Sequence, residues 1–124
     1  MKLPLLAAGA INAALAVGAG AFAAHGLRER LAARSLEIFE TAARYQMYHA
    51  LGMILCALLA AGLPGAKTAG WILQAGIVIF SGSLYLLALT DVKVLGAITP
   101  IGGLAFLVGW AWLAITALRG GSAA

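Results

Sequence analysis

Charge is scarce in this chain, and acidic residues are scarcer still. Among its 124 residues there are eight Lys or Arg and four Asp or Glu, so 10% of the chain is charged, against about 25% in a typical soluble domain. All of these charges lie outside four uncharged runs, which are Leu3–Leu27, Tyr45–Ala66, Thr68–Thr90 and Val94–Leu118. Because no carboxylate lies deep inside a run, the sequence shows no obvious acid–base or proton-coupling chemistry within a membrane.

Cysteine and histidine are also rare. Cys56 is the only cysteine, which excludes an internal disulfide. His25 and His49 are the only histidines, and without a second thiol or an intramembrane carboxylate they form a weak ligand set, so we predict no metal and no cofactor. The net charge of +4 comes from basic residues that flank the apolar runs. Since such residues commonly face lipid headgroups, nucleic acid is not an expected partner.

The chain is rich in long apolar runs. A helix needs roughly 20 apolar residues to cross a bilayer core, and each of the four runs exceeds this without reaching twice that length. The runs do not alternate in polarity as barrel strands do, which leaves helices. We predict an all-α membrane protein with a single four-helix transmembrane domain over residues 1–124. Its spans are expected at about 3–25, 45–63, 69–89 and 95–118.

One sizeable polar segment, Gly26–Arg44, lies between the first two spans and carries seven of the charges. Leucines spaced along it predict a short amphipathic segment at the interface over residues 26–44. Ser35 is a candidate N-cap. No Pro or Gly follows it until Gly52, so an unbroken helix over Leu36–Leu63, with its polar first turns outside the membrane, is also open.

The later connections are marked by turn residues. Leu63-Pro64-Gly65 ends the second helix. Thr90–Lys93 is short enough to predict a tight antiparallel hairpin. Pro100 either starts the last helix near its first position or kinks it. Counting basic residues favours a cytoplasmic first loop and external termini. The counted residues are Arg28, Arg30, Arg34, Arg44 and Lys93 on one side, and Lys2, Lys67 and Arg119 on the other.

A polar cluster is predicted where the second helix enters the membrane. Helical spacings of three and four place several of its members on one face, and Glu40 precedes Arg44 by four residues, as in a favourable ion pair. The candidate residues are His25, Glu37, Glu40, Thr41, Arg44, Tyr45, Tyr48 and His49. Two interpretations remain. The favoured one is a paired network that fixes the packing of the first two helices. The other is a headgroup, quinone or anion site built on Arg44.

Small residues predict close helix packing in lipid. The candidates are Gly9, Ala13, Ser81, Gly82, Gly102 and Gly103. Asn12 is the strongly polar side chain of the first run, for which we favour an interhelical hydrogen bond. Ser81 and Ser83 lie mid-helix, without the strand-to-helix elbow that a serine nucleophile needs, so no catalytic residue is predicted.

Four ordered segments resemble a known family. They are GAINAALAVGAGAFAAHGL, FETAARYQMYHALG, IVIFSGSLYLLALT and LGAITPIGGLAFLVGW. These segments are similar to those of the small bacterial membrane proteins of domain-of-unknown-function family 423, which is related to transmembrane protein 256 of eukaryotes. Ala23 stands where the family commonly has Gly. The resemblance implies a multi-pass protein of the bacterial inner membrane with four helices, and it implies no activity.

We therefore expect a non-enzymatic membrane protein that binds lipid or a partner membrane protein, as part of a complex or by self-association. A small-molecule or ion transporter or channel is one alternative, although Glu37 and Glu40 are expected at the interface, whereas proton coupling needs an intramembrane carboxylate. A membrane enzyme is the second alternative. It would need His25, Arg44 and His49 to converge in one pocket.

Overall fold

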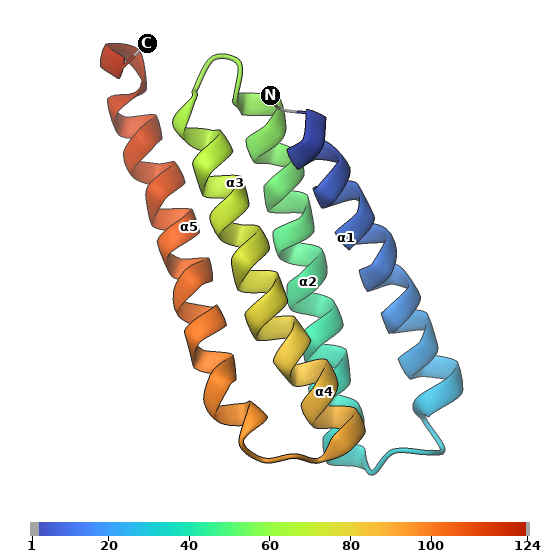
Figure 1. Cartoon of the computed structure of the whole chain (residues 1–124). Coiled ribbons are helices and arrows are strands. Elements are labelled where there is room, and N and C mark those ends of the chain that lie inside the picture. The colour runs from blue at the N-terminus through green and yellow to red at the C-terminus, as the bar shows by residue number, and fades with distance from the viewer. Residues whose placement is uncertain (1–2, 124) are drawn as a thin grey trace.

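The computed structural model describes residues 3–123, and the side chains up to Gly120, as four antiparallel helical rods (Figure 1). Lys2 lies outside the described residues. The elements, in order, are α1 (Leu3–Phe22) continued by the π-helical turn η1 (Ala23–Leu27), α2 (Ala33–Leu59), α3 (Gly65–Gly76), the π-helical turn η2 (Ile77–Ser81), α4 (Gly82–Thr90) and α5 (Leu95–Ala123). Since η2 joins α3 to α4 without a break, these three elements form one rod.

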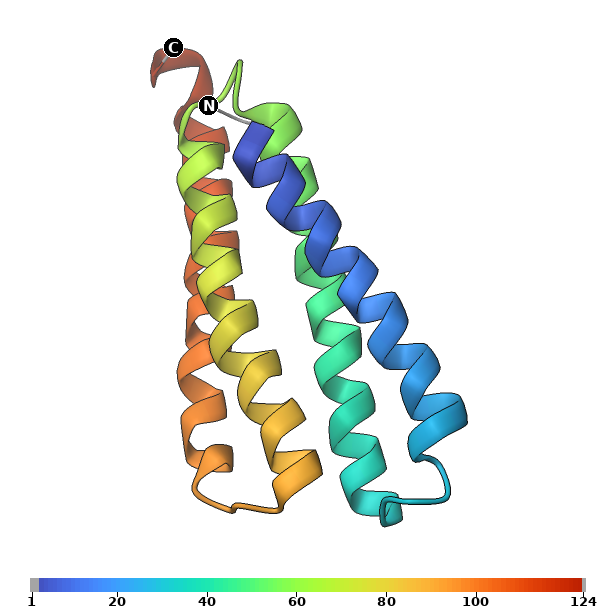
Figure 2. The same cartoon turned by 45° about the vertical axis from the view of Figure 1, so that its right-hand side comes forward.

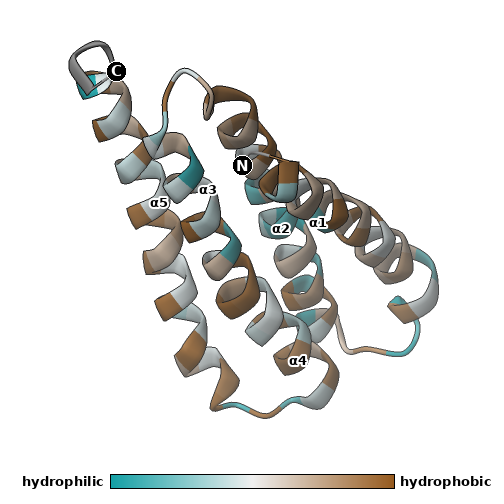
Figure 3. Cartoon of the chain, turned by 45° about the horizontal axis from the view of Figure 1, so that its top comes forward, coloured by the Kyte–Doolittle hydropathy of each residue, from teal (hydrophilic) through white to brown (hydrophobic). Residues whose placement is uncertain are grey.

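Three of the rods are long and apolar enough to cross a membrane. They cover Leu3–Leu27, Gly65–Thr90 and Leu95–Gly120. Figure 3 shows hydrophobic residues along the length of both α1 and α5. The fourth rod, α2, is not among them, and four charged residues lie in its first turns, from Arg34 to Arg44.

The predicted amphipathic segment over residues 26–44 is not a separate element. The turn occupies residues 28–32, and Ala33–Arg44 forms the first turns of α2. One unbroken helix is thus observed, as in the alternative, but it covers Ala33–Leu59 and not Leu36–Leu63, because a turn precedes Pro64. The residue before α2 is Ala32, which makes no side-chain cap bond, and Ser35 is not the N-cap. Apolar residues of these turns pack against the bundle: Phe39 is buried in a cluster with Leu27 and Ala88.

Both later connections are tight. Asp91 has left-handed backbone geometry (φ 58°), and its N–H donates to the Leu87 carbonyl at 2.8 Å. The predicted hairpin between α4 and α5 is therefore confirmed. Pro64 has helical dihedral angles and leads directly into α3, so the third rod begins at Gly65 and not near residue 69. Pro100 lies inside α5, which begins at Leu95, so Pro100 does not start that helix.

Glycines set how closely the rods approach. A Cβ on Gly9 would lie 2.8 Å from Ile54 Cγ1 and 3.1 Å from the Ala50 carbonyl oxygen, so α1 and α2 are in close contact there. A Cβ on Gly102 would overlap the backbone of Phe80, which brings α5 against η2. These positions agree with the packing prediction.

The other predicted packing residues differ among themselves. Ser81 is fully buried and donates to the Ala42 carbonyl at 2.8 Å. Ala13 is half-buried. Gly103 makes an ordinary contact with the Phe80 ring. Gly82 does not pack against a neighbouring helix, because no atom lies within 4 Å of the position its Cβ would take.

The rods α1 and α3–η2–α4 meet at one end and separate at the other. A Cβ on Gly70 of α3 would lie 2.6 Å from Leu5 Cδ2, so the two rods are in contact near the start of α1. Figure 2 shows α1 leaning away from α4 toward the first loop. This divergence leaves a wedge between α1 and α4, with α2 behind it.

A candidate ligand groove with a polar floor

The wedge holds an open groove of about 690 Å³. Its lining residues Leu15 of α1, Val78 of η2 and Leu89 of α4 are exposed, so the groove is open at the side of the bundle. None of its lining residues is charged. They are Asn12, Ala14, Leu15, Gly18, Ala19, Phe22, Phe39, Gln46, Gln74, Ile77, Val78, Ser81, Gly82, Tyr85 and Leu89.

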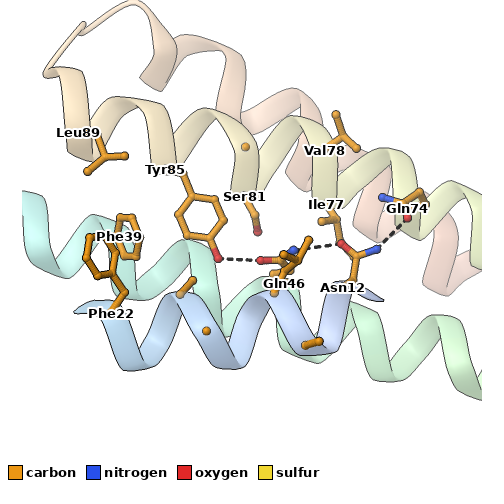
Figure 4. A pocket seen from close by; sticks show the side chains of 15 residues that line it. Asn12, Phe22, Phe39, Gln46, Gln74, Ile77, Val78, Ser81, Tyr85 and Leu89 are labelled. Carbon is orange, nitrogen blue, oxygen red and sulfur yellow. Dashed lines mark hydrogen bonds between the residues drawn. The ribbon is translucent and has the colours of Figure 1, made fainter. Parts of the chain in front are cut away.

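Four uncharged polar side chains from three rods form a chain of hydrogen bonds along this groove (Figure 4). The Tyr85 hydroxyl donates to Gln46 Oε1 at 2.7 Å. Gln46 Nε2 donates to Asn12 Oδ1 at 3.0 Å, and Asn12 Nδ2 donates to Gln74 Oε1 at 2.8 Å. The chain therefore ties α1, α2 and the α3–η2–α4 rod together in the region where the rods diverge.

The direction of this chain is set by a backbone carbonyl. Asn12 Nδ2 also donates to the Ala8 carbonyl at 2.9 Å, which orients the Asn12 amide. Asn12 Oδ1 then faces Gln46 and can only accept, so Gln46 must present Nε2 to it. Gln46 Oε1 consequently faces Tyr85, and Tyr85 must donate. At the other end, Gln74 must turn Oε1 toward Asn12.

With this direction, N–H donors remain without an acceptor at two places, on Gln74 at the end of the chain and on Gln46 within it. Gln74 Nε2 has no hydrogen-bond partner among the described residues, and Gln46 Nε2 has one acceptor for its two hydrogens. Asn12 and Gln46 are buried, whereas Gln74 is half-buried and lines the groove. An unpaired N–H in an apolar setting is costly, so the Gln74 amide is a ready donor to any acceptor that enters the groove.

The walls of the groove are shaped by small residues and closed by rings. Neither Gly18 nor Gly82 has an atom within 4 Å of the place its Cβ would take, so both leave open space on opposite walls. Toward the first loop, Phe39 stacks edge-on with Phe22 (6.3 Å between ring centroids) and with Tyr85 (4.8 Å). The groove is thus apolar on its sides and polar along its floor.

The opposite side of α2 is filled by aromatic rings. The His49 ring lies parallel to the Phe106 ring, with 3.5 Å between centroids, and Trp110 lies 5.8 Å away. His49 Nδ1 donates to the Tyr45 carbonyl at 2.7 Å, and Tyr45 packs on Phe80 at 4.8 Å. Since His49 is buried against α5, this side holds a packed stack of rings.

The structure does not bring the eight predicted cluster residues together. His25, Glu37, Glu40 and Arg44 are exposed, and none of them forms an ion pair within the described part of the chain. The predicted pair of Glu40 with Arg44 is therefore absent there, because α2 carries both side chains outward at its solvent end. Thr41 bonds only the backbone carbonyl of its own helix at residue 37.

The remaining members of the cluster also diverge. Tyr48 is exposed and packs near Tyr45, with 5.6 Å between ring centroids. His49 faces α5, whereas His25 lies exposed in η1. His25, Arg44 and His49 consequently do not share a pocket. Residues 3–120 also contain no group of three or more His, Cys, Asp or Glu that could hold a metal ion.

The sequence pattern did not predict most of this groove. Asn12 was expected to bond between helices, and this is confirmed. Gln74, Gln46 and Tyr85 were not placed in a site. The signal that could have found Gln74 is its position: it is an amide in the middle of the third apolar run, and polar groups at such depth need partners or a function.

Comparison with known proteins identifies the family. A family described as protein of unknown function (DUF423) matches residues 19–103. The UPF0382 membrane protein YwdK of Bacillus subtilis is 50% identical over 114 residues, which cover 90% of this chain and 93% of that protein. A UPF0382 membrane protein of Staphylococcus epidermidis is 53% identical over 112 residues, covering 90% and 92%.

A further relative, the UPF0382 membrane protein SAB0533 of Staphylococcus aureus, is 47% identical over 120 residues, covering 96% of this chain and 98% of that protein. No solved structure matches the chain. The chain belongs to the DUF423 family of membrane proteins. The resemblance found in its four motif segments is thereby confirmed.

Proposed function

We propose that this protein is a four-span protein of the bacterial inner membrane that binds a membrane lipid in the groove between α1 and α4, without catalysing a reaction. The observation that carries the proposal is the groove itself: it is uncharged, open to the side, and crossed by a polar floor whose donors are not all used. Small-molecule sites typically combine apolar walls with a few placed polar groups in this way.

The fourth span in this proposal is α2. Its apolar part runs from Tyr45 to the end of the helix at Leu59, which is about 22 Å at 1.5 Å per residue, and the apolar turn up to Leu63 extends it toward the thickness of a bilayer core. The charged turns before Tyr45 would then project from the membrane on the side of the first loop. α2 packs between the other rods, which supports this placement, because α2 cannot move out of the membrane without separating from them.

Lipid is the occupant that the position of the groove favours. An apolar groove that opens sideways within a bilayer is bordered by lipid tails, and no charged side chain lines it to attract a free ion. A transporter would need a polar path between the two surfaces, whereas the Phe22 and Phe39 rings close the groove toward the first loop.

Purification in mild detergent followed by native mass spectrometry tests the proposal. We expect a bound lipid on the wild-type protein and its loss in Gly18→Leu, because the new side chain enters open space on the groove wall. Gly20→Leu is the matched control: it also has no atom within 4 Å of its Cβ, lies on the same helix, and does not line the groove. Equal lipid retention in the two variants would overturn the proposal. A co-purifying protein that is lost only in Gly18→Leu would indicate that the groove binds a helix of a partner protein and not a lipid.

A further inference from the structure

We infer that the lipid is a neutral carbonyl lipid of the quinone class, whose ring oxygens accept hydrogen bonds from the amide donors of the groove floor. The inference rests on the proposed lipid site and specifies its ligand. Four properties of the groove lead to it: the amide donors without an acceptor, the absence of charge, the depth of Gln74 and Asn12 in their helices, and the open side.

The first property is the donor-to-acceptor direction of the hydrogen-bond chain along the groove floor. Because the Ala8 carbonyl orients Asn12, the unused hydrogens are those of Gln74 Nε2 and one on Gln46 Nε2. A ligand that satisfies them must offer acceptors. A quinone ring carries two carbonyl acceptors and no donor, which matches this requirement.

The second property is the lack of charge. Every lining residue is uncharged, so a phosphate or ammonium headgroup inside the groove would lose its water without gaining a counter-ion. The end of the bundle toward the first loop does not offer a strongly cationic surface either. It holds all four acidic residues beside five basic ones, Arg28, Arg30, Arg34, Arg44 and Lys93. The part of the ligand within the groove is therefore neutral.

The third property is depth. Gln74 lies 9 residues along the rod Gly65–Thr90, which places it about 5 Å from the midpoint of that span at 1.5 Å per residue. Asn12 is similarly close to the midpoint of Leu3–Leu27. The ester carbonyls of a phospholipid lie at the edge of the hydrocarbon core, about 15 Å from its centre. A ligand that presents a carbonyl to Gln74 must carry it deep in the bilayer, as a lipid quinone does.

The fourth property is that the groove has room for a ring and leaves a path for a long tail to extend out of it. Its volume of about 690 Å³ lies within the range of small-molecule sites. The flat walls left by Gly18 and Gly82 admit a planar ring between α1 and α4. Because the groove is open at its side, a long apolar tail can extend into the surrounding lipid.

Binding of decylubiquinone to the purified protein in detergent micelles tests the inference, with dioleoylglycerol and phosphatidylglycerol as parallel ligands. Native mass spectrometry measures occupancy at a series of ligand concentrations. We expect saturable binding of decylubiquinone, at least tenfold weaker binding of the two glycerolipids, and a tenfold or larger loss of decylubiquinone affinity in Gln74→Met, which keeps the length of the side chain but removes its N–H donors.

Gln74→Met also takes an acceptor from Asn12, so the thermal unfolding temperature is measured alongside binding. Gly18→Leu offers a second route, since it blocks the groove without touching the polar chain. Decylubiquinone binding that survives both variants, or that is no stronger than glycerolipid binding, would overturn the quinone inference. Glycerolipid binding that is at least as strong as decylubiquinone binding and that Gly18→Leu abolishes would overturn only this inference and leave the lipid site standing. The proposed function fails if no ligand responds to Gly18→Leu.

Discussion

The two sides of α2 differ more than their sequence suggests. Gln46 and His49 are three residues apart, and both are buried polar side chains. Gln46 joins a chain of hydrogen bonds in an open groove, whereas His49 lies in a stack of rings that α5 covers. The comparison teaches that a buried polar residue in this bundle marks a candidate site only where the neighbouring helices separate. Where they close, the same polarity serves packing.

The largest expected effect comes from disturbing the closed side. In Gly102→Ala, the added methyl group would overlap the backbone of Phe80, which cannot move without separating α5 from η2. We expect a loss of about 3 kcal/mol in the free energy of unfolding or a failure to accumulate in the membrane. Thermal unfolding in detergent measures it. Gly103→Ala is the control, since its Cβ would make only an ordinary contact with the Phe80 ring. Equal stability of the two variants would contradict the close approach of α5.

A smaller effect is expected on the open side. Gln46→Leu preserves side-chain size but leaves Asn12 Oδ1 and the Tyr85 hydroxyl without their shared partner. We expect a loss of about 2 kcal/mol in the free energy of unfolding. This value is at the lower end for two buried hydrogen bonds, because each such bond contributes modestly in membranes. Removing Tyr85's hydroxyl in Tyr85→Phe tests the coupling: in the Gln46→Leu background it should cost little further. Additive losses would argue that the two residues do not act as one network.

The smallest effect is expected at the charged end of α2. Arg44 is exposed and forms no ion pair with a carboxylate of the described residues. Arg44→Ala should therefore change the free energy of unfolding by no more than about 0.5 kcal/mol, as surface substitutions usually do. Unfolding curves measured at low and high salt check this. A loss above about 2 kcal/mol that salt removes would restore the paired cluster expected from the sequence.

The charge pattern was sufficient to predict the helices and misleading about the site. Charges end apolar runs, so their positions predicted four helices and the tight turn at Asp91. The same charges drew attention to residues such as Glu40 and Arg44, which α2 carries outward. Spacing along one helix could place them on a common face, but it could not tell whether another helix lies opposite that face.

The groove depends on facts that the sequence does not contain. Gln74 and Asn12 are 62 residues apart, and their contact requires the relative rotation of two helices. The open wall at Gly82 depends on the divergence of α1 from α4, whereas the neighbouring Ser81 faces a tight contact with α2. Small residues were predicted to pack helices together, yet at Gly18 and Gly82 they leave space. Only the arrangement of the rods distinguishes these two uses of a glycine.

Photo-crosslinking in the native membrane tests the central claim, a lipid bound between α1 and α4, most directly. Cells fed a photoreactive fatty acid are irradiated, and adducts on the purified protein are mapped to individual residues by mass spectrometry. The account predicts adducts concentrated on groove residues such as Leu15 and Val78, and their loss in Gly82→Leu but not in Gly20→Leu. Adducts spread equally over the outer face of α5, at Leu104 and Leu107, and unchanged by Gly82→Leu would contradict it.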